Sequence, residues 1–198
     1  MRRTFKYRLY PTKAQALVLD RWLWLCRQLY NACLEQRMRR KSLSKFDQKR
    51  ELVDLKEGFP EFKEIGAHVL CDVVYRVDAS FKRFFKQHAG FPKFRGRGRY
   101  ESFAFPDAAG WKLFPSGCLR LTGCGEVKIR LDRPIQGTIK TVTIKRSRSG
   151  RWFACFSCDA VPAKVYPETV TPVGIDLGLS TLVTTSDGEK LGDTRFLK

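Results

Sequence analysis

One carboxylate in the sequence stands where phosphodiester chemistry could use it. Asp176 ends an apolar run and precedes a glycine turn in Gly-Ile-Asp-Leu-Gly, residues 174–178. A charged side chain in such a place is costly unless it is exposed at a strand end or binds an ion. Cleavage with two metal ions needs several carboxylates around Mg²⁺ or Mn²⁺, so Asp176 is a candidate catalytic and Mg²⁺-binding residue only where others complete the site. Asp187, in an Asp-Gly pair, is interpreted as a turn residue.

Cationic side chains dominate the rest of the chain and indicate an anionic partner. The net charge is +18, from 38 Lys and Arg against 20 Asp and Glu, which exceeds what solubility requires. An anionic membrane surface is the competing explanation, but no apolar stretch approaches the roughly 18 residues of a spanning helix. We therefore expect a nucleic acid. The candidate contacts are Lys6, Arg8, Arg76, Lys82, Arg83, Lys86, Lys93, Arg95, Arg97, Arg99, Lys145, Arg146 and Arg148.

The cysteines and the first residues favour a cytoplasmic protein with no zinc site in this chain. The opening Met-Arg-Arg-Thr-Phe-Lys-Tyr-Arg-Leu-Tyr interleaves basic and apolar residues, so it lacks the continuous apolar stretch of a signal peptide. Cys155 and Cys158 form a Cys-x-x-Cys, but they fall in a predicted strand whose alternation sends the two thiols to opposite faces. Without a second pair nearby, we expect no zinc.

Three helices are predicted after an N-terminal strand. Residues 4–10 alternate apolar or aromatic side chains with polar ones, which is typical of a strand with one wet side. Thr12 lies three residues before Gln15, a capping-box spacing that begins a helix over 12–39. Further helices are expected over 44–57 and over 67–88, before a basic loop at 90–99. The apolar stripe of the last helix is Leu70, Val73, Val74, Val77, Phe81, Phe84 and Phe85.

Short strands without intervening helices follow the basic loop. They are predicted at residues 102–105, 111–114, 118–121, 127–131, 138–145 and 151–160, the last two flanking a basic hairpin tip. Such a series predicts a small antiparallel barrel, completed by the N-terminal strand, and thus an α+β fold. A linker over 161–171 leads to a buried strand, a glycine turn and a second strand, with a slight excess of acidic residues.

The segment around Asp176 is compatible with two families of the RNase H-like fold. Gly-Ile-Asp-Leu-Gly resembles the first strand of RuvC-type nucleases and also the first phosphate loop of actin-like and Hsp70-like ATPases. In the ATPases this strand lies near the start of a long domain, whereas here about 170 strongly basic residues come first. This context favours the nuclease.

Four segments in this order resemble the TnpB (OrfB) proteins of bacterial insertion sequences, relatives of type V CRISPR effectors. They are Phe-Lys-Tyr-Arg-Leu-Tyr-Pro-Thr-Lys-Ala-Gln at 5–15, Leu-Tyr-Asn-Ala-Cys-Leu at 29–34, Gly-Phe-Pro-Lys-Phe-Arg at 90–95 and the segment at 174–178. The resemblance implies a wedge-like barrel from 1–11 and 92–170, a helical recognition lobe over 12–91, and the start of a RuvC domain over 171–198. It also implies a guide RNA, and a double-stranded DNA target that the RNA pairs with and the nuclease cleaves.

The resemblance assigns roles to a few residues. Asp176 matches the first of the family's three catalytic carboxylates, while the other two and the zinc ribbon would lie further downstream, so we expect the chain to bind without cleaving by itself. Mg²⁺ is the family's ion, and a separate chain could supply the rest of the site. A short DNA motif beside the target would be contacted near His68, Cys71 and Asp72, at the start of the last helix.

Two other functions fit the same residues. A stand-alone, cleavage-dead regulator or partner subunit needs only the basic surface. A helix-turn-helix transcription factor is suggested by the first helices with their basic ends, but a recognition helix enters the major groove with polar residues leading, and the long first helix is too apolar for that. Our first hypothesis is therefore the RNA- and DNA-binding part of an RNA-guided endonuclease, associated with the nucleoid through DNA.

Overall fold

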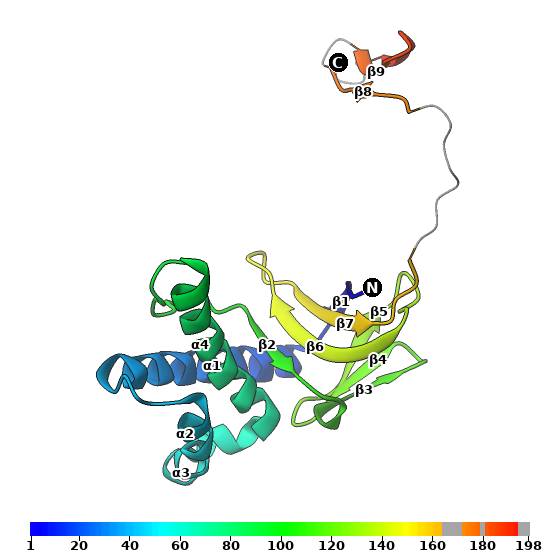
Figure 1. Ribbon diagram of the computed structural model, residues 1–198. Coiled ribbons are helices and arrows are strands. Elements are labelled where there is room, and N and C mark those ends of the chain that lie inside the picture. Colours follow the sequence, from blue (N-terminus) through cyan, green and yellow to red (C-terminus); the bar gives the residue numbers. More distant parts are fainter. Residues whose placement is uncertain (164–171, 179–180, 194–198) are drawn as a thin grey trace. The chain divides into compact units, whose positions relative to one another are not determined.

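The computed structural model describes residues 1–163, 172–178 and 181–193 of the chain (Figure 1). The chain divides into two units, Met1–Pro162 and Ala163–Lys198, which are considered separately below. Among the described residues, no helix has the length and apolar character that crossing a membrane requires.

Seven antiparallel strands of the first unit form one strongly curled sheet in the order β2-β6-β7-β1-β5-β4-β3 (Figure 1). The two edge strands, β2 and β3, do not pair with each other, so within the described residues the predicted barrel is open and forms a half-barrel. The N-terminal strand occupies its centre and pairs with β7 on one side and β5 on the other. The strands are β1 (Arg3–Tyr10), β2 (Ser102–Phe105), β3 (Trp111–Phe114), β4 (Cys118–Leu121), β5 (Gly125–Arg130), β6 (Thr138–Arg146) and β7 (Trp152–Asp159).

Period-two alternation places the apolar side chains of these strands on the inner face of the sheet. Tyr7 and Phe156 pack edge to face there, with ring centroids 5.8 Å apart, and the hydroxyl of Tyr7 donates to the carbonyl oxygen of Arg133 at 3.0 Å. Along β7 every second residue is buried, which includes Cys158 and excludes Cys155. The prediction that these two thiols lie on opposite faces is therefore confirmed.

Four α-helices and two short 3₁₀ helices complete the first unit. The capping box of the first helix is confirmed, since the amide of Gln15 donates to the hydroxyl of Thr12 at 3.2 Å and the Gln15 side chain accepts the Thr12 amide at 3.0 Å. The helices are α1 (Lys13–Arg39), α2 (Lys45–Arg50), α3 (Leu52–Gly58), η1 (Pro60–Glu64), α4 (Ala67–Gln87) and η2 (Ala108–Gly110).

Two details of the helices differ from the prediction. The helix expected over 44–57 is broken at Glu51 into α2 and α3. The carboxylate of Glu51 binds Gln36 at 2.8 Å and Arg40 at 3.2 Å near the end of α1, a tertiary contact that local periodicity does not register. On α4, Phe85 is 72% exposed rather than part of the buried stripe, because its ring packs on Phe84 at the end of the helix.

The helices are joined to the sheet by an aromatic contact at Trp22. This side chain is 1% exposed and meets Phe103 of β2 edge to face, with centroids 5.7 Å apart. Gly123, in the turn between β4 and β5, has φ +87°, and a Cβ there would lie 2.9 Å from the Trp22 ring. Trp22 of α1 therefore packs against both β2 and the β4–β5 turn.

The second unit contains three short antiparallel strands, β8 (Ile175–Asp176), β9 (Thr181–Thr185) and β10 (Lys190–Asp193), in the order β10-β9-β8. The Asp-Gly turn is confirmed: Gly188 has φ +86° and its amide donates to Thr185 at 3.0 Å. The expectation of a buried strand is wrong for the described residues, since Ile175 is 68% and Leu177 is 74% exposed. Three short strands have no second layer here against which to bury a face.

Replacing Trp22 by Ala should lower the free energy of unfolding by about 3–5 kcal/mol, because it empties the space between α1, β2 and the β4–β5 turn. Leu17→Ala is the matched control on the same helix, at a side chain that is 71% exposed, and it should change stability by less than about 0.5 kcal/mol. Urea unfolding followed by circular dichroism measures both. Equal effects of the two substitutions would contradict the role given to Trp22.

Candidate nucleic-acid interface

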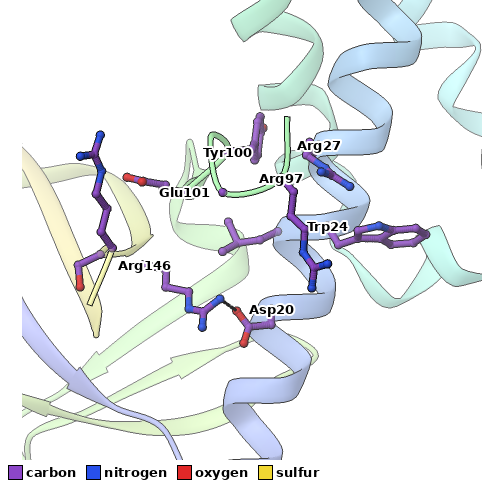
Figure 2. Close-up of a pocket in the computed structure, with 11 residues that line it drawn as sticks. Asp20, Trp24, Arg27, Arg97, Tyr100, Glu101 and Arg146 are labelled. Atoms are coloured by element: carbon purple, nitrogen blue, oxygen red, sulfur yellow. Dashed lines mark ion pairs between the residues drawn. The ribbon is translucent and has the colours of Figure 1, made fainter. Parts of the chain in front are cut away.

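Two adjoining pockets between α1 and the β6–β7 hairpin form what we call the arginine groove. The first, of about 810 Å³, is lined by Asp20 to Arg27 on α1, by Arg97 to Glu101 of the basic loop, and by Arg146 to Arg148 at the hairpin tip (Figure 2). The second, of about 620 Å³, shares Gly98, Tyr100, Glu101 and Arg148 with the first and extends toward α4. Four segments that are distant in sequence, α1, α4, the basic loop and the β6–β7 hairpin, therefore build one surface.

The basic loop is irregular, as predicted, but it is anchored to α1. The side chain of Asn31 forms two hydrogen bonds with the backbone of Arg95, accepting its amide at 2.8 Å and donating to its carbonyl oxygen at 3.1 Å. The guanidinium of Arg95 lies over the ring of Tyr30, 5.6 Å from its centroid. The loop thus presents its arginines from a fixed backbone position.

The hairpin tip is attached to the same helix by an ion pair. Arg146 donates to Asp20 at 3.0 Å, and both side chains are partly exposed (Figure 2). Such a pair contributes little stability in water, at most about 1 kcal/mol, but it fixes one position of the tip relative to α1. Serine hydroxyls shape the tip itself, where Ser147 accepts the amide of Arg151 at 3.1 Å.

The groove has a strong excess of positive charge. Its only acidic linings among the described residues are Asp20, which is paired, and Glu101. Two buried polar atoms beside it, Nε of Arg27 and the hydroxyl of Tyr100, have no hydrogen-bond partner in the described structure. Burial raises the pKa of Tyr100, so this hydroxyl stays protonated and can donate. The cationic side chains that line the groove are Arg27, Arg76, Arg83, Arg95, Arg97, Arg99, Lys145, Arg146 and Arg148.

Eight of the thirteen predicted contact residues thus meet at the groove, although their binding role stays a prediction. Arg76 is already engaged within the fold, because it donates to Asp72 at 2.7 Å and to the carbonyl oxygen of Ser102 at 2.7 Å. Lys93 lines a smaller neighbouring pocket with Arg83 and Arg95. The structure places the other four elsewhere.

Those four residues lie on β1 and on α4. Lys6 and Arg8 cover the ring of Phe153, at 4.1 and 5.2 Å from its centroid, on the face of the sheet opposite the core. Lys82 pairs with Asp78 at 3.0 Å, and Lys86 is exposed in the last turn of α4. None of the four lines the arginine groove.

The residues predicted to contact DNA beside the target lie at the start of α4. His68 pairs with the carboxylate of Asp107, and Asp72 is bonded to Arg76. Burial raises the pKa of Asp72, against the opposing effect of Arg76. Cys71 is partly buried against the core. None of the three predicted residues lines the groove, and their role stays a prediction.

Sequence reasoning missed one cationic and three aromatic residues of the groove, namely Arg27, Trp24, Tyr30 and Tyr100. Trp24 and Arg27 lie three residues apart on α1, outside its buried stripe, so they project from one face. An aromatic residue beside an arginine on the polar face of a helix was the available signal. Nothing in the local sequence separates Tyr30 and Tyr100 from ordinary core residues.

Asp176 is exposed on β8 of the second unit. Among the described residues, no three His, Cys, Asp or Glu side chains come together to hold a metal ion. Mg²⁺ keeps its own waters unless several oxygens are fixed around it. The described residues therefore do not fit a Mg²⁺ site, and we derive no cleavage step through one.

Comparison with known proteins agrees with the resemblance in the sequence. Residues 1–42 match the OrfB_IS605 family model, described as a helix-turn-helix domain. In this chain that segment folds as β1 and one uninterrupted helix, whose buried side chains pack in the core and are not available to enter a DNA groove.

Two curated relatives extend the match to nearly the whole chain. A Streptomyces pristinaespiralis protein named as an RNA-guided DNA endonuclease is 33% identical over 205 residues, covering 96% of this chain and 50% of the relative. InsQ of Escherichia coli K12, named for the same activity, is 28% identical over 193 residues, with coverage of 93% and 47%. The chain spans about half the length of these relatives. Over the length that it spans, the chain is similar to proteins named as RNA-guided DNA endonucleases, in agreement with its resemblance to the TnpB (OrfB) family.

Proposed function

We propose that the first unit binds the guide RNA, and the DNA beside its target, in an RNA-guided DNA endonuclease of the TnpB type. The observation that carries this proposal is the arginine groove, where four segments bring nine cationic side chains together against two acidic ones. The names of the relatives support an RNA and a DNA partner. In such systems base pairing reads the sequence, while the protein recognises shape and phosphates.

The arrangement of the groove suits a phosphate backbone. Arginine offers a planar fork of donors that matches phosphate oxygens, and it keeps its charge at any physiological pH. Arg97 and Arg148 form no ion pair with the described residues, so their guanidinium groups are available to a ligand. Asn31 holds the backbone of the basic loop, so the ordering cost of binding falls mainly on the arginine side chains.

For Asp176 we propose the role of one carboxylate in a Mg²⁺-dependent nuclease site whose remaining ligands are not among the described residues. Its support is the position at the end of β8, before Leu177-Gly178, together with the similarity to proteins named as DNA endonucleases. This role differs in chemistry from RNA binding, which we assign to cationic side chains of the first unit.

The affinity of the purified chain for structured RNA from its own locus should fall with salt. Between about 50 and 200 mM salt we expect a loss on the order of 10²- to 10³-fold, because each neutralised phosphate releases counterions. Fluorescence anisotropy at four or more salt concentrations gives the slope. A slope near zero is incompatible with binding through phosphates.

The double variant Arg97→Ala/Arg148→Ala should weaken RNA binding and reduce the slope of log affinity against log salt by about two, one for each lost phosphate contact. The matched control is Lys49→Ala/Arg50→Ala on α2, which removes the same charge from exposed positions outside the groove. If the control weakens binding as much as the groove variant, the RNA is held by overall charge and the groove is not the interface.

Asp176→Asn should leave the RNA affinity unchanged, because we assign RNA binding to cationic side chains of the first unit, whereas Asp176 is a carboxylate of the second unit. Given RNA, Mg²⁺ and matched DNA, the chain by itself should not cut in either form, since one fixed carboxylate binds Mg²⁺ weakly. Gel assays of cleavage and anisotropy on the same samples check both statements. Cleavage that is present in the parent chain and lost in the variant would reveal partner carboxylates outside the described residues.

A further inference from the structure

Trp24 separates the arginine groove from a second, apolar pocket. Its side chain is 48% exposed and lines both. In Figure 2 the indole extends away from the Asp20–Arg146 pair, along the side of α1. The second pocket has a volume of about 350 Å³ and opens between α1 and the α3–η1 segment. Besides Trp24, its apolar linings include Leu25, Leu29, Leu55, Phe59 and Phe62, and its polar linings are Gln28 and Glu61.

The pocket is built on core residues but leaves aromatic surface open to solvent. Leu25, Leu29 and Phe62 are buried beneath it, whereas Phe59 is 54% exposed at its edge. Gln28 is the exposed amide at this site, offering both a donor and an acceptor. Exposed Trp and Phe beside this amide and the half-buried carboxylate of Glu61 make a surface suited to a flat, apolar ligand whose edge carries hydrogen-bond donors.

The neighbouring arginines indicate that this ligand carries a negative charge. Arg27 follows Trp24 by one helical turn and its buried Nε has no partner among the described residues. Arg97 lines the arginine groove together with Trp24 and Arg27. A ligand that reaches from these arginines over Trp24 must combine an anionic group with a flat apolar body, and a nucleotide has this composition.

We propose that one unpaired base of the bound strand turns out of the arginine groove, stacks on Trp24 and enters the apolar pocket, while Arg27 and Arg97 hold its flanking phosphates. This inference rests on the proposed function, because it requires a phosphate backbone in the arginine groove. A volume of about 350 Å³ lies at the small end of the range for ligand pockets, which suits one base rather than an amphipathic helix. Arg27 and Arg97, which line the adjoining arginine groove, favour the same occupant over a neutral protein segment.

Two single-stranded DNA probes of about 12 nucleotides separate stacking from phosphate contact. One is oligothymidylate, and the other has the same sugar-phosphate chain without bases. Trp24→Leu should lower the affinity for oligothymidylate about tenfold, and it should leave the affinity for the abasic probe unchanged. Trp24→Phe should restore most of the loss, since it keeps an aromatic face. Phe46→Leu on α2, at a ring that is 59% exposed, is the control for removing an aromatic residue elsewhere.

Intrinsic fluorescence gives a second readout on the same samples. Trp22 and Trp152 are buried and Trp111 is half-buried, so Trp24 is the most exposed of the four tryptophans. Oligothymidylate should quench the fluorescence of the parent chain, and this quenching should disappear in Trp24→Phe and be absent with the abasic probe. A melting curve establishes whether each variant is folded. If Trp24→Leu does not fold, Trp24→Phe carries the spectroscopic test.

The outcomes distinguish this inference from the proposed function. If Trp24→Leu binds both probes like the parent chain while Arg97→Ala/Arg148→Ala loses both, the base pocket is wrong and the arginine groove stands. Equal losses on the two probes also overturn stacking, because Trp24 would then act through the shape of the groove or through a different occupant of the pocket. If neither the arginine nor the tryptophan variants change binding, both proposals fail.

Discussion

The contact of Trp22 with Phe103 holds the helices on the curled sheet, and the candidate interface depends on it. The groove takes one wall from α1 and the opposite wall from the β6–β7 hairpin, so its width is set by how α1 packs on the sheet. Trp22 is buried, while Asp20 and Trp24, two residues away on either side, line the groove. One turn of helix therefore serves the core and the surface together, and a change in its packing would move both groove residues.

A chain with this net charge must keep its own cations from pushing the fold apart. Several basic residues therefore form ion pairs and hydrogen bonds within the fold. Arg37, at 9% side-chain exposure, donates to Asp78 at 3.0 Å and to Gln48 at 2.7 Å, which joins α1 to α4 and α2. Arg76 similarly joins α4 to β2 through Ser102. The positive charge of the protein is thus divided between arginines that organise the helices and arginines that remain available at the groove.

The sequence predicted the local elements well because their determinants are local. Alternation defined the strands, and the capping box at Thr12 and Gln15 defined the start of α1. The curvature of the sheet and the break at Glu51 depend on contacts between distant segments, so local patterns could not supply them.

The residues of the candidate site were likewise predictable only where their signal is local. The basic loop and hairpin tip were visible as charge runs, and eight of the predicted cations do meet at the groove. Arg27 and Trp24 were missed because their significance comes from the loop and hairpin that lie opposite them. Lys6 and Arg8, on the predicted wet side of β1, lie over the ring of Phe153 on the outer face of the sheet, and their contact with a nucleic acid stays a prediction.

The central place of β1 in the sheet has a consequence for how the protein is made. Phe5 pairs with Phe156 across the β1–β7 ladder, so the partner of the strand is translated roughly 150 residues later, on the order of 10 s after β1 emerges. Its other partner, β5, follows about 120 residues after it, so for most of that interval both edges of β1 lack their native partners, while α1 can already form from local contacts. The sheet should therefore assemble slowly and late, through pairings of large sequence separation.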